Sequence, residues 1–342
     1  MPLLKLRYDL RSASDDPHER ADRFAAALDQ VAWADRLGFH SVQFHEHHGV
    51  DDGYLPSPIV FAAAAAARTE RIGIEVGALL VPLHDPLRLA EDLAVLDLIA
   101  RGRLTVVPGA GYVPAEFEMF GKLKSQRGRS VERAVEVLRM AWAGEPFEYE
   151  GRQVRVTPRP FQRPGPPLLL GGGSEPAARR AARIGDGYSP TDAASWEHYR
   201  AACRDLGRPD PGELKPKGPL FVHVADDPEA AWAEIGEALL YEMNAYGKFA
   251  AAAGETTPFS ITESVEALRS SANYAVITPA ECIQLAESLG PDGTLTFRPL
   301  AGGLAPDLAW QSLRLFETAV APHIHLAPPR EVPDDITDDG LT

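Results

Sequence analysis

The sequence predicts an α/β protein, a single (β/α)8 TIM barrel with a surface hairpin insertion and a helical excursion between strands 7 and 8. Eight short apolar or alternating segments that suit strands recur along the 342 residues, and segments with helical spacing separate them. Residues 72–121 alone have the pattern of a strand, a helix, a second strand and a glycine-rich loop, which is a βαβ unit. A chain of this length suits one barrel of repeated strand–helix units.

The first half of the chain supplies four of the predicted strands and their helices. Apolar residues from Leu4 to Leu10 alternate with charged ones, and Gly38 and Gly102 suit the ends of two helices. Asp85 can cap a helix that starts at Pro86. The expected strands lie near 4–10, 39–44, 72–81 and 104–107, and the expected helices near 17–37, 59–68, 86–100 and 130–142.

The second half repeats the pattern with two additions. The segment 144–156 has the composition of a surface hairpin, and the stretch 247–277 predicts a loop and a weak helix near 262–273 over the barrel mouth. The remaining strands are expected near 168–170, 186–191, 220–224 and 294–297, and the remaining helices near 174–185, 195–206, 227–243, 279–289 and 308–320. Thr278 and Glu281 give the helix at 279–289 a capping-box pattern. Residues 1–326 are predicted to form one domain, and the proline- and aspartate-rich segment 327–342 a disordered tail.

Composition and charge argue against several classes of protein. The net charge of −15 argues against nucleic acid as a partner, because a phosphate backbone is bound mainly through basic patches. No apolar run approaches the roughly 18–20 residues of a membrane span. The first ten residues pass directly into a strand pattern without signal-peptide features, which predicts a cytoplasmic location. Cys203 and Cys282 have no metal-ligand spacing and suit reduced structural thiols.

Three segments at predicted strand ends could carry chemistry. The second strand ends in the titratable run His45-Glu46-His47-His48, and a histidine titrates near neutrality, which suits proton transfer. After the fourth strand, Gly109 and Gly111 let the backbone approach another group closely. The run Gly171-Gly172-Gly173-Ser174 lies between a strand and a helix N-terminus, where free N–H groups and the helix dipole favour an anion such as phosphate. In a barrel of this type, such strand ends form the site.

Several segments, taken in their order, resemble one family. They are EHH at 46–48, GALLVPLHDP at 77–86, LAEDLAVLDLIARGRL at 89–104, GAGY at 109–112 and EFEMFG at 116–121. From about Leu3 to about Ile324 the chain resembles the bacterial-luciferase-like flavin-dependent monooxygenases, the LLM class of flavin-dependent oxidoreductases. The resemblance implies an enzyme that uses FMN and O2 on a small apolar or carbonyl-containing organic substrate, through a flavin C4a-peroxide. In two-component systems of this kind, a separate flavin reductase supplies the reduced FMN.

The resemblance also implies roles for individual residues. His47 matches the catalytic histidine and would shuttle a proton, and Glu46 would fix the loop or orient a histidine. Gly77 and Ala78 fall where the family has a non-prolyl cis peptide beside the flavin ring, and Ser174 falls where a serine holds the flavin phosphate. The residues expected to bind the cofactor are Gly77, Ala78, Gly109, Gly111, Gly171, Gly172, Gly173 and Ser174. A substrate pocket is expected from Tyr8, Phe44, His45, His48, Tyr54, Tyr112 and Phe117.

One departure from the family concerns the cofactor. Members often have an arginine between the two glycines of the loop after the fourth strand, where it contacts the flavin phosphate, and this chain has Ala110. A charge-assisted hydrogen bond is worth roughly 1.5–3 kcal/mol, so its loss would weaken FMN binding roughly ten- to a hundredfold. The same departure leaves deazaflavin F420, and with it hydride transfer, as an alternative.

Two other functions are compatible with the residues. A metal-dependent hydrolase on the same barrel would use a ligand set drawn from His45, His47, His223 and Asp226, but the glycine-rich loops would then have no purpose. A non-catalytic flavin-binding protein is supported only by Ala110. We favour a monooxygenase without a metal. The helices at 59–68 and 86–100 lie where the family dimerises, so a homodimer is predicted.

Overall fold

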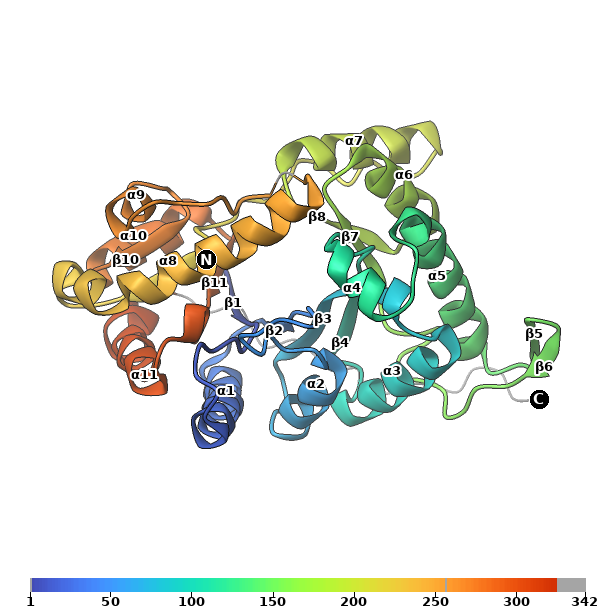
Figure 1. Cartoon of the computed structure of the whole chain (residues 1–342), viewed down its shortest axis with the longest axis horizontal. Helices are drawn as coiled ribbons and strands as arrows, with labels where there is room; N and C mark the ends of the chain where they lie inside the picture. Colours follow the sequence, from blue (N-terminus) through green and yellow to red (C-terminus); the bar gives the residue numbers. More distant parts are fainter. Residues whose placement is uncertain (1, 256, 325–342) are drawn as a thin grey trace.

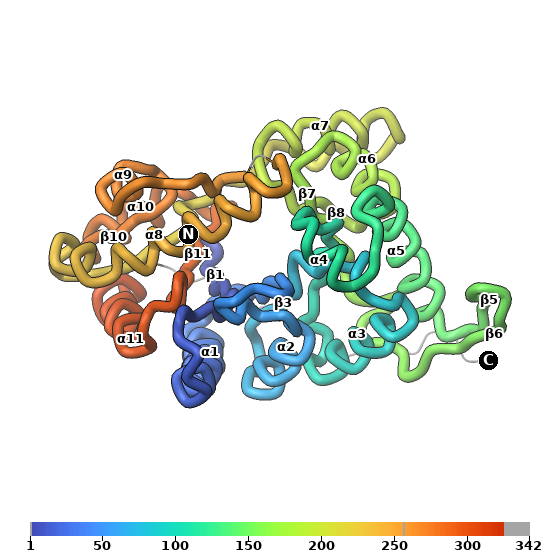
Figure 2. The backbone as a smooth tube through the Cα atoms, in the orientation of Figure 1, coloured from blue at the N-terminus to red at the C-terminus, as the bar shows by residue number. Residues whose placement is uncertain are grey.

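Helices surround parallel strands in the computed structural model, which describes residues 2–255 and 257–324 (Figure 1). The strands of the main sheet are β1 (Leu3–Tyr8), β2 (Ser41–Phe44), β3 (Gly73–Leu79), β4 (Leu104–Pro108) and β11 (Thr294–Phe297). They pair in the order β11-β1-β2-β3-β4, and every pair is parallel. Val42 of β2 lies opposite both Leu6 of β1 and Ile74 of β3. The last strand therefore lies beside the first, as the tube in Figure 2 shows.

Further parallel strands extend this sheet at both ends. They are β7 (Leu169–Gly172), β8 (Gly187–Pro190), β9 (Phe221–Val224) and β10 (Tyr274–Ile277). β7 pairs with β8, and a bridge between Val106 and Leu168 joins the segment before β7 to β4. β9 pairs with β10, and a bridge between Lys217 and Thr294 joins the segment before β9 to β11. The chain is thus the predicted (β/α)8 barrel, with β10 as an additional strand.

The helices begin at the signals that the sequence provides. Asp85 accepts a hydrogen bond from the backbone N–H of Arg88 at the start of α3, and Thr278 and Glu281 form the predicted capping box of α10. Gly38 ends α1 in the left-handed conformation, with a φ of 94°. The bounds are α1 Pro17–Leu37, α2 Pro58–Ala67, α3 Pro86–Ala100, α4 Pro114–Met119, α5 Arg127–Ala143, α6 Glu175–Ile184, α7 Ala193–Asp205, α8 Pro228–Ala253, α9 Val265–Arg269, α10 Pro279–Leu289 and α11 Pro306–Leu315.

The two predicted additions to the barrel have different outcomes. The hairpin is confirmed, because β5 (Phe147–Tyr149) and β6 (Arg152–Val154) pair antiparallel. The excursion is also present, but its first part is helical where a loop was expected. α8 continues to Ala253 because Tyr246 and Ala250 extend its buried face and alanine favours helix. The weak helix expected near 262–273 is the short α9, and the strand β10 follows it, with Tyr274 and Val276 alternating into the core.

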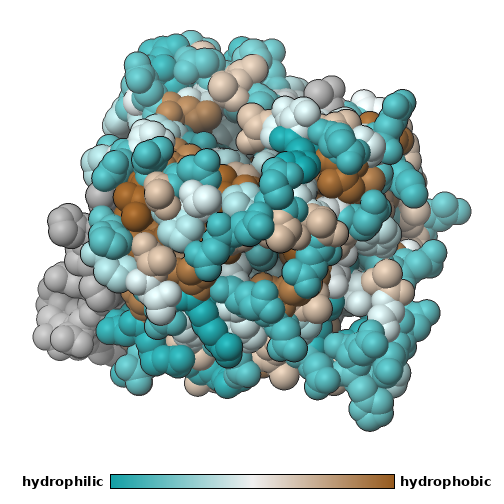
Figure 3. Space-filling model, turned by 90° about the vertical axis from the view of Figure 1, so that its left-hand side faces the viewer, coloured by the Kyte–Doolittle hydropathy of each residue, from teal (hydrophilic) through white to brown (hydrophobic). Residues whose placement is uncertain are grey.

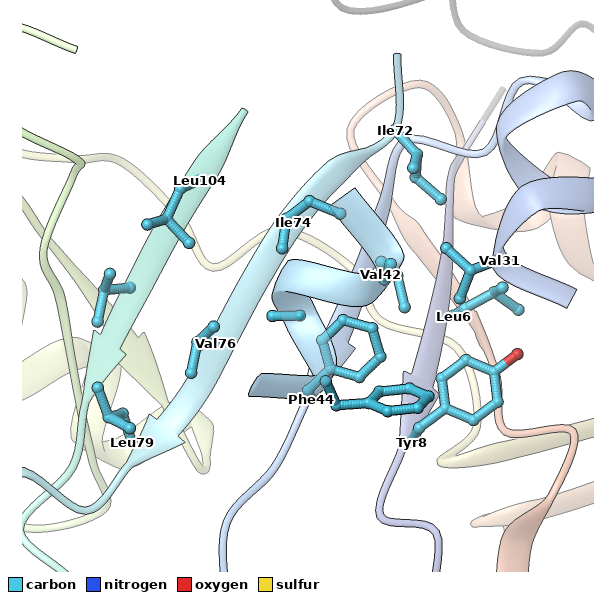
Figure 4. Packing of buried hydrophobic residues seen from close by; sticks show 14 of the residues in the cluster. Leu6, Tyr8, Val31, Val42, Phe44, Ile72, Ile74, Val76, Leu79 and Leu104 are labelled. Carbon is cyan, nitrogen blue, oxygen red and sulfur yellow. The ribbon is translucent and has the colours of Figure 1, made fainter. Parts of the chain in front are cut away.

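The main hydrophobic core lies between the strands and the outer helices. Along β1, the side chains of Leu4, Leu6 and Tyr8 are buried and the intervening ones are only partly buried. Figure 4 shows Leu6 and Tyr8 packed with Phe44 of β2 and Val31 of α1. The alternation therefore sends apolar side chains outwards to the helices and leaves Lys5 and Arg7 on the inner face of the barrel.

One face of the molecule is mainly hydrophilic, with small apolar patches between the polar side chains (Figure 3). Within the described residues, no helix combines the length and the hydropathy that crossing a bilayer needs. Cys203 and Cys282 are both buried and unpaired. The predicted tail, 327–342, lies outside the described residues.

Candidate functional site

Glu46 organises the segment that follows β2. Its buried carboxylate accepts hydrogen bonds from the backbone N–H of Leu80, from His48 Nε2 at 2.8 Å and from His84 Nε2 at 2.7 Å. Burial opposes ionisation of Glu46, but the hydrogen bonds from His48 and His84 outweigh it and lower its pKa to about 2. Glu46 thus ties the β2 end to the β3 end, which is the loop-fixing role that the resemblance implies.

Replacing Glu46 with glutamine is expected to remove a pH-dependent part of the stability. The pKa of Glu46 falls from 4.5 to about 2 on folding, which corresponds to about 3 kcal/mol. A depressed carboxyl pKa stabilises the fold above pH 4.5, and this contribution disappears as the pH falls towards 2. Urea unfolding at several pH values should therefore show a higher free energy of unfolding for wild type than for E46Q at pH 7, and this gap should close in acid. E118Q, at an exposed carboxylate of α4, is the control, and a gap that is independent of pH would contradict the assignment.

His47 is held from one side by Glu116 of α4. Its Nδ1 lies 2.7 Å from Glu116 Oε1, and the same oxygen accepts the backbone N–H of His48 at 2.9 Å. Both His47 and Glu116 are buried. A carboxylate only accepts hydrogen bonds, so Nδ1 carries a hydrogen and Nε2 is the nitrogen that is left to exchange a proton.

Four aromatic rings surround His47, and we call them the aromatic cage: Tyr54, Tyr112, Tyr246 and Phe249. Their ring centres lie 4.8, 5.7, 6.3 and 4.9 Å from that of His47, respectively. Tyr54 and Tyr246 share a hydrogen bond between their hydroxyl groups at 2.9 Å. The cage draws on the loops after β2 and β4 and on α8, so the histidine faces a largely aromatic environment.

The glycine-rich ends of β3 and β4 lie against each other. The peptide bond between Gly77 and Ala78 is cis, as the resemblance implies. A Cβ on Gly77 would lie 2.5 Å from the Cβ of Val107, and a Cβ on Gly109 would lie 2.8 Å from that of Ala78. Only residues without a side chain fit there, so the backbones of the two strand ends approach closely.

The loop after β7 lies next to this region. A Cβ on Gly171 would lie 3.2 Å from Val107 Cγ1, which places β7 beside β4. Ser174 caps α6, and its hydroxyl oxygen accepts the N–H of Ala177 at 3.4 Å. The hydroxyl hydrogen of Ser174 is not used in that bond, so it can donate to a ligand. The hydroxyl of Tyr188 holds the loop by donating to the carbonyl of Gly172 at 2.6 Å.

Arg127 supplies a positive charge beside the loop after β4. Its Nη1 donates to the carbonyl of Gly111 at 3.3 Å, and its Nη2 lies 2.9 Å from Glu255 Oε1. Ala110 stands between the two glycines, where family members often have an arginine. Arg127, at the start of α5, places a guanidinium at the same loop from another element. Nothing in the sequence distinguishes Arg127 from the other arginines of the chain.

Two predicted pocket residues are placed elsewhere, and this corrects the prediction. The hydroxyl of Tyr8 donates to Gln30 of α1 at 2.9 Å, and the ring of Phe44 packs edge-on against Phe61 of α2, with ring centres 5.2 Å apart. Successive side chains of a strand point to opposite faces, so both rings face the helices and their neighbours face the barrel interior. The prediction placed both residues near a strand end but did not establish the direction of their side chains.

The other predicted pocket residues divide into two groups. Tyr54 and Tyr112 contact His47, and His45 lies on the inner face of the barrel. His48 is held by Glu46 and packs against Phe120, at 4.7 Å between ring centres. Phe117 lies beneath the loop after β4, where a Cβ on Gly111 would be 3.2 Å from its ring. His48 and Phe117 therefore support the site from behind.

The structure also identifies residues that the sequence analysis missed. Glu116 is part of the EFEMFG segment that carried the resemblance, but nothing in the sequence shows that it contacts His47. Tyr246 and Phe249 lie on the part of α8 that was not predicted as helix. The residues proposed for a hydrolase do not assemble, because the described part of the chain has no group of three or more His, Cys, Asp or Glu side chains that could hold a metal ion.

Comparison with known proteins places the chain in a family. A family model described as luciferase-like monooxygenase matches residues 8–295. The chain belongs to this family. It is 30% identical to limonene 1,2-monooxygenase of Rhodococcus erythropolis, over 90% of the chain and 85% of that protein. It is 25% identical to the oxygenase component of the flavin-dependent trigonelline monooxygenase of Acinetobacter baylyi, over 60% of each protein.

A solved structure in complex with FMN has the same fold. It is the oxygenating constituent of 3,6-diketocamphane monooxygenase from Pseudomonas putida, a type II Baeyer-Villiger monooxygenase, with a TM-score of 0.72 and 23% identity. The match covers 95% of this chain and 99% of that one. At this level of identity the likeness shows the fold alone. Several other curated relatives match over only 47–64% of their own length.

Proposed function

We propose that this protein is a flavin-dependent monooxygenase that uses FMN and O2 to oxygenate a small organic substrate. One observation carries the proposal. His47, held through Nδ1 by Glu116, faces the aromatic cage, and Tyr112 of that cage directly follows the glycine loop at the end of β4. A histidine with one fixed and one free nitrogen, beside backbone that admits close approach, suits proton transfer next to a planar cofactor.

The residues present fit the phosphate and ring of FMN. Ser174 offers a hydroxyl hydrogen at the N-terminus of α6, where free N–H groups and the helix dipole favour a phosphate. Arg127 adds a guanidinium at the neighbouring loop. The backbones of β3 and β4 pack closely at Gly77 and Gly109, and the flat ring is expected to lie against these strand ends. The residues expected to bind the cofactor lie at the ends of β3, β4 and β7, and we propose that FMN lies across them.

The protein's own side chains prepare and protect the reaction. Reduced FMN supplies the electrons with which O2 is activated. His47 gives a proton to, or takes one from, the reacting oxygen through Nε2, and Glu116 keeps the ring in the orientation that this needs. Tyr54, Tyr246 and Phe249 exclude water around the histidine and favour an apolar substrate or the apolar part of one.

Replacing Ser174 with aspartate tests the phosphate site while keeping the helix cap. Aspartate caps helices well, but its charge would repel a phosphate. We expect S174D to weaken FMN at least tenfold, and to leave riboflavin, which has no phosphate, nearly unchanged. The measurement is a titration followed by flavin fluorescence, with S264D at the cap of α9 as the matched control. Equal loss of FMN and riboflavin would contradict a phosphate site at Ser174.

F420 is the alternative cofactor, and Ala110 is the observation that favours it. The titration should include reduced F420 for this reason. A clear preference for F420 over both forms of FMN would replace oxygenation with hydride transfer as the proposed reaction.

We also propose a homodimer formed through α2 and α3. Apolar side chains remain exposed on these neighbouring helices: Val60, Val95, Leu98 and Ile99 are 72, 45, 39 and 39% exposed. A row of apolar residues on two adjacent helices suits burial against a second copy. The double substitution V95D/L98D is expected to halve the mass found by light scattering, and L206D, at the exposed apolar residue that follows α7, is the control. A wild-type protein with the mass of a monomer would end this proposal.

Two further proposals concern a partner protein and the location of the enzyme. We propose that a separate flavin reductase supplies reduced FMN, because the trigonelline relative is the oxygenase component of its system. The unpaired buried thiols of Cys203 and Cys282 are consistent with a reducing compartment, which supports a cytoplasmic location.

A further inference from the structure

The inner face of β1 and β2 is polar, in contrast to the aromatic cage. Lys5 on this face lies 2.7 Å from Glu75 Oε2, and the side-chain amide of Gln43 donates to the other oxygen of Glu75. The charge of Lys5 is thereby neutralised within the barrel. Arg7, two residues further along the same face, does not share this arrangement.

Arg7 has no ion pair and no hydrogen bond in the described part of the chain, and its Nε is buried without a partner. The other two arginines near the barrel mouth are paired. Arg11 contacts Asp9 and Asp52 at 3.4 and 3.1 Å, and Arg298 contacts Asp9 at 3.3 Å. Arg7 as a whole is only partly buried, but a guanidinium whose Nε is kept from water without a partner loses part of its hydration. An unpaired one at a functional site therefore suggests a negatively charged ligand.

His45 brings a second unpaired group to the same place. Its Nε2 is buried without a hydrogen-bond partner. Burial, followed by the positive charge of Arg7, lowers the pKa of His45 well below its usual value, so the ring is neutral and can donate one hydrogen bond. Arg7 lies opposite Gln43, and His45 follows Phe44, which lies opposite Val76, the residue before Gly77.

We propose that Arg7 and His45 form a subsite for an anionic oxygen next to the flavin ring. The inference rests on the proposed function, because Gly77 is where the ring is expected. The oxygen belongs either to the organic substrate, as a carboxylate, phenolate or enolate, or to the ring of reduced FMN, which carries a negative charge that the oxidised ring lacks. Arg7 supplies the charge and two parallel N–H donors, and His45 supplies a third donor.

A structural role for Arg7 makes the opposite prediction about stability. If Arg7 holds the barrel together, its removal should destabilise the protein. If Arg7 serves to bind a ligand, Arg7→Met removes an unpaired charge and should leave the melting temperature unchanged or higher. The thermal midpoint of R7M, compared with that of the exposed control R152M, separates these cases before any ligand is added.

The ligand is then tested with defined probes on wild type, R7M, R7K and R152M. Oxidised FMN and dithionite-reduced FMN are titrated anaerobically, and benzoate and benzyl alcohol are titrated against the FMN complex. If the reduced ring provides the charge, R7M should weaken reduced FMN about ten- to a hundredfold more than oxidised FMN. If the substrate provides it, R7M should weaken benzoate by a similar factor and leave benzyl alcohol unchanged. R7K should keep most of the affinity that R7M loses, and R152M should bind every probe as wild type does.

Three results would overturn the inference. The first is a large loss of thermal stability in R7M, which would make Arg7 structural. The second is a wild type that binds FMN together with an R7M variant that binds each of the four probes as tightly as wild type does. This would remove the subsite but leave the monooxygenase. The third is a wild type that binds no form of FMN, which would remove the proposed function together with the subsite.

Discussion

Replacing His47 with alanine is expected to lower turnover by about 10²–10⁴-fold, the usual contribution of a positioned general acid or base. The affinity for FMN should change little, because the groups proposed to hold the phosphate lie on the loops after β4 and β7. His47 is 6% exposed and its Nδ1 is held by Glu116, which fixes the orientation of the ring. The measurement is FMNH2-dependent product formation by mass spectrometry, against a panel of small ketones, aldehydes and terpenes.

Two further variants separate proton transfer from simple loss of packing. H18A removes an exposed histidine of α1 and should retain full activity. E116Q keeps the size of the side chain but replaces the carboxylate, so it should lower turnover less than H47A does. Added imidazole should restore part of the activity of H47A and none of that of E116Q. Undiminished turnover in H47A would remove the catalytic role altogether.

The barrel was predictable from the sequence because its signals are local. The cap at Asp85, the capping box at Thr278 and the alternation along β1 each lie within a few residues, and each specifies one element. The order of the elements then leaves few ways to pack them. The end of α8 was harder, since Gly247 suggests a helix end and only tertiary burial of its neighbours shows that the helix continues.

The site was less predictable because its residues come from distant parts of the chain. The sequence and the resemblance indicated His47, but its partner Glu116 lies 69 positions away and Tyr246 and Phe249 lie on α8. The direction of side chains was also not apparent. The alternation along β1 identifies two faces, and only the packed structure shows that Tyr8 faces α1 and Arg7 the interior. The alternation that turns Tyr8 towards α1 turns Arg7 towards the interior, where the subsite is proposed.

Removing Arg298 should cost the fold about 3–5 kcal/mol, the usual effect of breaking a buried ion pair. Arg298 is 2% exposed, and it joins Glu242 of α8 to Asp9 at the end of β1. Burial raises the pKa of Glu242 to about 7, while Arg298 opposes this shift. In R298M, Glu242 would lose its cationic partner, and Asp9 would keep only Arg11 as a cationic partner. Urea unfolding of R298M and of the exposed control R152M measures the difference, which should stay below about 0.5 kcal/mol for R152M.

Removing Arg298 should also loosen the aromatic cage, because Glu242 and Tyr246 lie one turn apart on α8. The hydroxyl of Tyr246 donates to Asp9 Oδ2 at 3.1 Å, so Arg298, Asp9, Glu242 and Tyr246 together fasten α8 over the barrel. Hydrogen exchange of α8 amides near Tyr246 is therefore expected to rise in R298M more than that of α1. The double variant R298M/E242Q should recover part of the stability, since the glutamine carries no charge to leave unpaired. A free energy of unfolding for R298M within about 1 kcal/mol of wild type would show that the network does not fasten α8, and that the cage is held by ring packing alone.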